Sequence, residues 1–404
     1  MQAFLNQYRS FFALPDVTRI VLISIIARLP LGMMSFAMLM FLREVLGSFA
    51  LAGSVVGVYF IAMAVTAPIQ GRLIDRVGPR LPLAVTGIIH PAAFLGIWLA
   101  GVMAWGYTVL ILLAIVAGAF VTPINTLSRT LWRHRFEDGG QRKTAFAIDS
   151  VAIEVNFTVG PAIVALLLAF ASATWAFAVA VASVVLAILV FWQSPAFKYW
   201  HREPAGERHL LGPLTDLRLL LVFACNFGLT FSFGVLEVTY AGFATAAGAA
   251  ALAGVLIGLN SIGSATGGLL YGGLHLRAPL ERQFAGSLAL LAAMVGLHSV
   301  VSSPWIMGSL ALASGLLIAP ALTAQTLLIS RIAPPKYATE AFTWSSTFIV
   351  SGIGIGTATA GWMIEHRGVP SAFLMGAASL VCAAALALTM RVARHGPLSV
   401  QNEN

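Results

Sequence analysis

Apolar residues occur in long runs that short polar or glycine- and proline-containing breaks interrupt. A helix needs about 20 apolar residues to cross the hydrocarbon core of a bilayer. Runs of that size predict twelve membrane-spanning helices, at residues 17–42, 49–70, 81–103, 106–131, 145–170, 174–193, 216–240, 250–274, 283–302, 304–330, 338–364 and 370–391. The pattern therefore predicts an all-α protein whose outer surface faces lipid.

Composition agrees with this prediction. Of the 404 residues, 59% are apolar and 9% are charged, whereas about a quarter of the residues in a soluble domain carry a charge. The two cysteines give neither a disulfide framework nor the spacing of a metal site. We expect no metal and no cofactor.

The basic residues fall in alternate loops, which predicts the orientation of the chain, because lysine and arginine collect on the cytoplasmic side. One side receives Arg72, Arg76, Arg80, Arg133, Arg135, Arg142, Lys143, Lys198, Arg202, Arg208, Arg277, Arg282, Lys336, Arg391 and Arg394. The loops of the other side hold only Arg43 and Arg367. Both termini are therefore expected in the cytoplasm, with the chain in the inner (cytoplasmic) membrane. The scatter of these residues over short loops argues against nucleic acid as a partner.

The chain repeats itself weakly with a period near 200 residues. Gly57 returns as Gly258, Pro123 as Pro320, and the pair Ala145 and Phe146 as Ala341 and Phe342. The repeat predicts two parallel halves of six helices each. We place the N-terminal bundle at residues 1–193, a cytoplasmic linker at 194–215 and the C-terminal bundle at 216–404.

The loop between the second and third spans carries the most specific motif. Residues 71–80 read GRLIDRVGPR, with Gly71, Leu73, Asp75, Arg76, Gly78 and Arg80 at the signature positions. The segment resembles the G-x-L-x-D-R-x-G-x-R loop of the major facilitator superfamily. The resemblance implies a secondary transporter that moves a small molecule across the bilayer by alternating access of its two bundles.

The same resemblance implies a cytoplasmic gate. Gly71 has no side chain, so the second helix can closely approach another helix, which the family makes the eleventh. Asp75 can then lie at the N-terminus of that helix, where the helix dipole favours an anion. We include Arg129, at the inner end of the fourth helix, in this gate. The alternative is a loop whose charges only set the topology.

A second, weaker resemblance lies in the fifth helix. Val159, Gly160 and Pro161 resemble the core of the family's antiporter motif G-x-x-x-G-P-x-x-G, although Asn156 and Val164 replace the flanking glycines. The segment favours antiport only weakly. A glycine-proline pair also occurs as a simple helix kink.

Four ionisable residues inside the predicted spans are candidates for proton coupling, because a charge at membrane depth needs a partner or a function. Arg28 and Glu154 lie at nearly equal depth in the first and fifth helices, so we expect an ion pair between them. Asp149 lies closer to the cytoplasmic end, within reach of Arg129. Glu237 is expected near the outer surface on the seventh helix.

The resemblance implies that the first, fourth, seventh and tenth helices line a central substrate cavity. Candidate lining residues are Ser35, Phe36, Thr122, Asn125, Asn226, Thr230, Phe231, Thr323 and Gln325. So few polar groups suit an amphipathic or drug-like solute better than a sugar or a phosphate ester.

These observations favour proton-coupled export of such a solute by a monomer whose partners are the solute, protons and the bilayer. Two alternatives stay open: an importer or uniporter of a small polar metabolite, and a membrane receptor or sensor that does not transport. An enzyme is not expected, because the sequence contains no metal-protease, hydrolase or nucleotide-binding motif.

Overall fold

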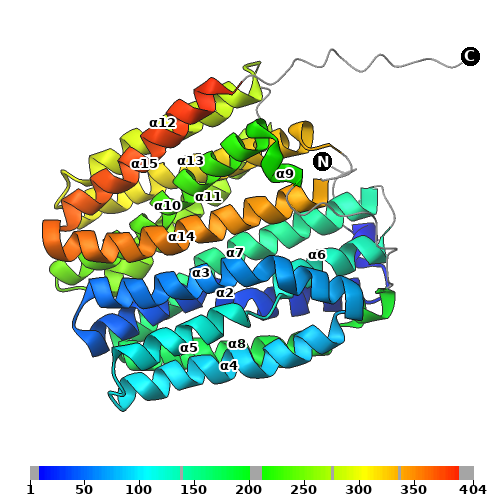
Figure 1. The fold of residues 1–404 in the computed structure, drawn as a ribbon, viewed down its shortest axis with the longest axis horizontal. Helices are drawn as coiled ribbons and strands as arrows, with labels where there is room; N and C mark the ends of the chain where they lie inside the picture. Colours follow the sequence, from blue (N-terminus) through cyan, green and yellow to red (C-terminus); the bar gives the residue numbers. More distant parts are fainter. Residues whose placement is uncertain (1–8, 137–139, 201–211, 274–276, 335–337, 391–404) are drawn as a thin grey trace, which may run out of the picture.

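A computed structural model describes residues 9–136, 140–200, 212–273, 277–334 and 338–390. The helices are α2 (Val17–Leu46), α3 (Phe49–Val77), α4 (Arg80–Val102), α5 (Tyr107–Ala119), α6 (Ile124–Arg135), α7 (Gly140–Phe170), α8 (Ala173–Trp192), the 3-10 helix η1 (Pro195–Tyr199), α9 (Gly212–Thr215), α10 (Leu217–Ala246), α11 (Ala251–Gly273), α12 (Leu280–His298), α13 (Pro304–Ile332), α14 (Ala338–Arg367) and α15 (Val369–Thr389). We call α2 to α8 the N-bundle and α10 to α15 the C-bundle (Figure 1).

All twelve predicted spans are present among the described residues, and no helix end is displaced by more than seven residues. The largest displacement is at the end of α3, which continues past the predicted residue 70 to Val77. Capping interactions close to the helix ends determine where the spans end. Gly47 closes α2 with a φ of 68°, and the Ser48 side chain then accepts a hydrogen bond from the backbone N–H of Leu51 at the start of α3.

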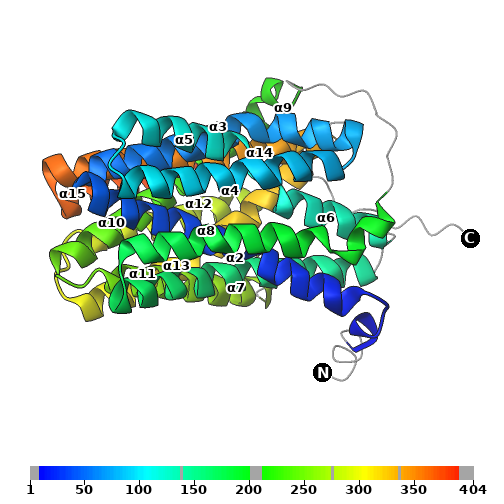
Figure 2. The ribbon, with the colours of Figure 1, turned by 90° about the horizontal axis from the view of Figure 1, so that it is seen from below.

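The molecule has two ends, which we name by their residues. The basic end is where α3 ends and α4 begins, around Arg80, and the distal end is where α2 ends and α3 begins, around Gly47. The α2 helix starts at the basic end, as Figure 2 shows from below, and α15 finishes there, as Figure 1 shows. Exposed tryptophans near the span ends, such as Trp105, Trp175 and Trp305, fit the aromatic belt of a membrane protein.

Among the described residues, the buried core that the two bundles share lies toward the distal end. One cluster of buried residues lies near the basic end of the N-bundle, where Phe11, which precedes α2, packs against Trp132 and Phe136. A second cluster is built by the C-bundle. The third combines the distal halves of α2 and α3 with residues such as Val238 and Ala360 of the C-bundle. The distal half of the molecule therefore packs as one core.

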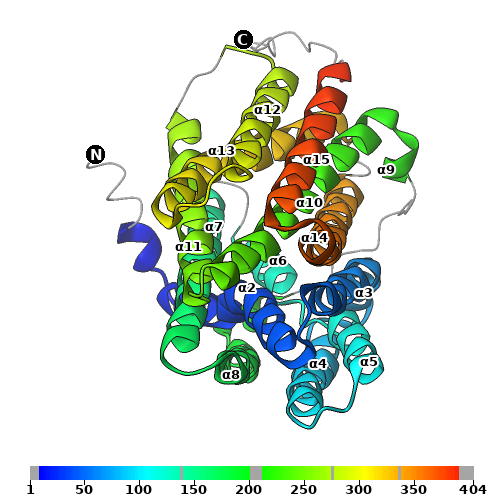
Figure 3. The same ribbon diagram turned by 90° about the vertical axis from the view of Figure 1, so that its left-hand side faces the viewer.

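Among the described residues, the bundles meet mainly through two helix pairs: α3 packs against α14, and α7 packs against α11. Figure 3, which looks onto the distal end, shows both pairs side by side. Glycines make this approach close, because a Cβ on Gly57 would lie 2.6 Å from the carbonyl oxygen of Gly354, and a Cβ on Gly254 would lie 2.7 Å from that of Pro161. At the basic end, a Cβ on Gly71 or Gly272 would meet no atom within 4 Å.

Candidate functional site

A buried arginine organises the polar centre of the N-bundle. The side chain of Arg28 on α2 is 1% exposed, and its Nη2 lies 2.7 Å from Oδ1 of Asp149 on α7. Its Nε donates to Oδ1 of Asn125 on α6 at 2.7 Å, and its Nη1 donates to Ser24. Every nitrogen of the guanidinium therefore has a partner, as a buried charge requires.

Asp149 holds a second arginine from the other side. Its Oδ2 accepts a hydrogen bond from Nε of Arg129 at 3.3 Å, and Oδ1 also accepts from Ser128 at 3.3 Å. The Arg129 side chain is 59% exposed. The ion pair predicted from the sequence between Arg129 and Asp149 is therefore present, and the cluster of two arginines and one aspartate has a net charge of +1.

The structure pairs Arg28 with a carboxylate other than the predicted Glu154. The side chain of Glu154 lies outside the described part of the chain, and the ionic partner that the structure gives Arg28 is Asp149. Asp149 lies five residues before Glu154 on α7, closer to the basic end. Side chains lean toward the N-terminus of their helix. The long side chain of Arg28 therefore extends toward the basic end and meets Asp149 there.

The fourth span is broken, which the apolar pattern did not predict. Its helix ends at Ala119 and resumes at Ile124, with Pro123 just before the second part. Gln70 of α3 donates to the carbonyl of Ala119 at 2.8 Å, which satisfies one freed backbone group. The Oγ1 of Thr122 is buried and has no hydrogen-bond partner in the part of the chain that the structure describes. Thr122 and Pro123 were the signal in the sequence, because proline ends a helix at the preceding residues.

The C-bundle has a neutral counterpart of the arginine cluster. Ser345 of α14 accepts hydrogen bonds from Nδ2 of Asn226 on α10 at 3.1 Å and from Nε2 of Gln325 on α13 at 2.9 Å. By the internal repeat, Ser345 is the equivalent of Asp149, and Gln325 is the equivalent of Ser128. Ser345 was not among the residues predicted from the sequence, although the repeat of Ala145 as Ala341 leads to it directly.

The remaining cavity candidates differ in exposure. Asn125 and Thr323 are exposed and Phe231 is half-buried, whereas Phe36 and Thr230 are buried. Thr230 donates to the backbone carbonyl of Asn226 within its own helix, at 2.9 Å. Their role toward a substrate stays a prediction.

Two carboxylates join the bundles in the distal half. Ser35 of α2 donates to Oε1 of Glu237 on α10 at 2.5 Å. Nearer the distal end, Oε1 of Glu365 on α14 accepts a hydrogen bond from the backbone N–H of Ala50 at 3.1 Å, in the first turn of α3. A carboxylate at a helix N-terminus interacts favourably with the helix dipole. Polar contacts thus reinforce the distal closure.

Comparison with known proteins identifies the family. The sequence pattern of the Major Facilitator Superfamily matches residues 20–313, which is more than half of the chain. The chain belongs to the Major Facilitator Superfamily. This membership makes it a secondary transporter rather than an enzyme.

The individual relatives share little sequence identity with this chain. The MFS-type transporter opdF of Penicillium oxalicum is 26% identical over 199 residues, which cover 46% of this chain and 44% of that transporter. The crystal structure of the nucleoside transporter NupG has a TM-score of 0.73 at 12% identity and covers 94% of this chain and all of NupG. A point mutant of NupG, also 12% identical, gives a TM-score of 0.76 over 92% of this chain and 98% of the mutant. These structures support the major facilitator fold.

The glycine of the superfamily signature loop makes no close helix contact among the described residues. A Cβ on Gly71 would meet no atom within 4 Å, although α3 packs against α14, the eleventh span, further along its length. The role predicted for Gly71 in a gate stays a prediction. The side chain of Asp75 lies outside the described residues. Gly78 has a φ of 89°, a conformation that favours glycine, and a Cβ there would lie 3.4 Å from the Trp200 ring. Arg76 and Arg80 are exposed.

Proposed function

We propose that this transporter exports small amphipathic molecules in exchange for protons, and that Glu237 carries the proton. The observation that supports this role most directly is the hydrogen bond between Ser35 and Glu237, which crosses from one bundle to the other. Both residues lie about ten residues, or roughly 15 Å, from the distal ends of their helices. This distance supports a position of Glu237 inside the membrane, deeper than the position near the outer surface that was predicted from the sequence.

Protonation of Glu237 would act on the closure between the bundles. A hydroxyl that donates to a carboxylate makes a charge-assisted hydrogen bond, which is stronger than the bond to a neutral carboxyl group. Loss of the negative charge therefore weakens the contact to Ser35 and favours separation of the bundles at the distal end. In this scheme the proton shifts the equilibrium between the two open states, as alternating access requires.

The proposed direction of transport depends on which end of the molecule faces the cytoplasm. We propose that the basic end faces the cytoplasm, because the arginine-rich loops lie there, and that the structure is the inward-open state of an inner-membrane protein. A solute from the cytoplasm then enters between the bundles near the exposed side chains of Asn125 and Arg129. The few polar groups at this depth support an amphipathic solute.

The test uses the purified chain in sealed proteoliposomes of known orientation. Rhodamine 6G, tetraphenylphosphonium and uridine serve as solutes of decreasing apolar character, and an internal pH dye follows protons. Exchange predicts solute and protons moving in opposite directions. Movement in the same direction would identify a symporter, and absence of flux for all three solutes would favour a receptor.

The variant Glu237→Gln tests the proton carrier. We expect it to keep solute equilibration between the two sides and to lose accumulation driven by a proton gradient, because the amide cannot exchange a proton. Glu44→Gln is the matched control, since Glu44 is an exposed carboxylate near the distal end of α2. Undiminished gradient-driven transport in Glu237→Gln would contradict the assignment and move attention to Asp149.

A further inference from the structure

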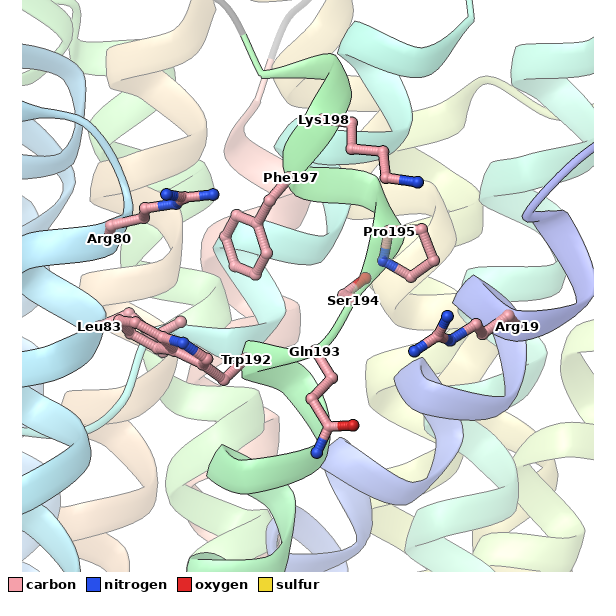
Figure 4. Close-up of a pocket in the computed structure, with 9 residues that line it drawn as sticks. All are labelled: Arg19, Arg80, Leu83, Trp192, Gln193, Ser194, Pro195, Phe197 and Lys198. Atoms are coloured by element: carbon pink, nitrogen blue, oxygen red, sulfur yellow. The ribbon is translucent and has the colours of Figure 1, made fainter.

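A basic pocket lies on the side of the N-bundle, away from the contact with the C-bundle. It has a volume of about 300 Å³ and is bounded by the start of α2, the start of α4 and the turn from α8 into η1. Figure 4 shows the guanidinium groups of Arg19 and Arg80 on opposite sides of the pocket, with Lys198 above and the Phe197 ring between them. No residue of the candidate transport site lies among its lining residues except Arg80.

The pocket concentrates positive charge that the described protein does not balance. Neither Arg19 nor Arg80 has an ion-pair partner among the described residues, and both are exposed. Lys198 is 3.9 Å from Asp16, with a side chain that is 73% exposed. Three cations and one aspartate leave a net charge of +2. Such a cavity favours an anion with several oxygen acceptors, because arginine matches phosphate geometry with paired donors.

The depth of the pocket points to the lipid headgroup layer. Arg19 lies in the first turn of α2, Arg80 is the first residue of α4, and Trp192 is the last residue of α8. The pocket is therefore level with the ends of three spans. Trp192 is 46% exposed, and tryptophan is enriched where membrane meets water.

The surface beside the pocket is apolar and faces outward. Leu81, next to Arg80, is 57% exposed, and Leu189, one turn before Trp192, is 58% exposed. On the outside of a transmembrane bundle such side chains contact acyl chains. A ligand with a phosphate in the pocket and hydrocarbon along α4 and α8 would use both features, whereas a free phosphate would use only the first.

We propose that this pocket binds the headgroup of an anionic phospholipid from the leaflet at the basic end. Arg19 and Arg80 would hold the phosphate from two sides, and Lys198 would contact the outer part of the headgroup. Because Lys198 lies on η1, which leads from α8 toward the C-bundle, the lipid would fasten this segment to α2 and α4. Basic pockets between helices on the cytoplasmic side are known to suit anionic headgroups.

The experiment measures lipid binding to the full chain in neutral detergent. Phosphatidylglycerol, phosphatidylcholine with the same acyl chains and inorganic phosphate are titrated separately, and native mass spectrometry and the melting temperature report binding. The proposal predicts saturable binding of phosphatidylglycerol that raises the melting temperature more than phosphatidylcholine does, with no equal effect of inorganic phosphate. An equal effect of inorganic phosphate would overturn the proposal in favour of a free-anion site.

The double variant Arg19→Gln with Arg80→Gln locates the binding. Each arginine near an anionic lipid contributes about a five-fold change in affinity, so we expect binding to weaken roughly 30-fold. The control is Arg277→Gln with Arg282→Gln, which removes two exposed arginines from the basic end of the C-bundle. Unchanged binding in the first variant, or an equal loss in the control, would refute the site. If the double variant does not fold, Lys198→Gln replaces it, with about a five-fold loss expected and no loss taken as refutation.

Discussion

Gly361 on α14 offers a direct way to disturb the distal closure. A Cβ at this position would lie 2.1 Å from the carbonyl oxygen of Phe49 and 3.2 Å from the Cα of Ala50, both on the opposite bundle. Non-bonded carbon and oxygen atoms need more than about 3 Å, so α14 must withdraw by about 1 Å. Overpacking of this kind costs about 1–3 kcal/mol. Because the clash is between bundles, Gly361→Ala can relieve it by opening the distal end.

That energy corresponds to a shift of about 5- to 150-fold toward the distally open state. The assay is a spin-label distance measurement between Leu51 on α3 and His366 on α14, in lipid nanodiscs and in a background without the native cysteines. We expect a longer distance to gain population in Gly361→Ala. Gly286→Ala on α12 is the control, since a Cβ there meets no atom within 4 Å. Equal distance distributions in both variants would refute a tight glycine contact.

Three further predictions follow from other contacts. In Gly71→Ala the added Cβ meets open space in this structure, so the spin-label distance should stay unchanged. Transport should slow if the basic end closes tightly in the alternate state. Full transport would argue against the gate. Asp149→Asn leaves Arg28 buried without a counter-charge, so the protein should lose roughly 3–5 kcal/mol of stability, seen as a lower melting temperature that Arg28→Gln partly restores. Glu365→Gln removes a charge from the N-terminus of α3, which should favour distal opening by about two- to five-fold, and an unchanged distance distribution would show that the bond does not hold the closure.

The sequence predicted the spans well because the bilayer imposes a length and a polarity on every helix. The same constraint hides how helices pair, since a segment that is apolar on all sides gives no period that identifies its buried face. The break in the fourth span was missed for this reason. The segment from 106 to 131 is apolar throughout its first half, and its interruption depends on Thr122 and Pro123 alone.

The partners of the buried polar groups were predicted less well. Counting residues along a helix gives the depth of a Cα atom, but the position of a charge also depends on the length and direction of its side chain, as Arg28 and Asp149 show. The bond between Ser35 and Glu237 joins residues about 200 positions apart. Both residues were named as candidates, but only the packing of the two bundles in three dimensions brings them together.

The glycine contacts between α3 and α14 have a consequence for energy conservation. A transporter driven by an ion gradient wastes that gradient if water forms a continuous file through the closed end. The backbones of the two helices touch directly where Gly57 meets Gly354 and where Gly361 meets Phe49. Such contacts leave no gap in which a water molecule fits. If transport is driven by protons, as proposed, we expect the absence of side chains at Gly57, Gly354 and Gly361 to limit proton leak through the closed end. A variant that still transports but separates these helices should then dissipate the gradient at rest.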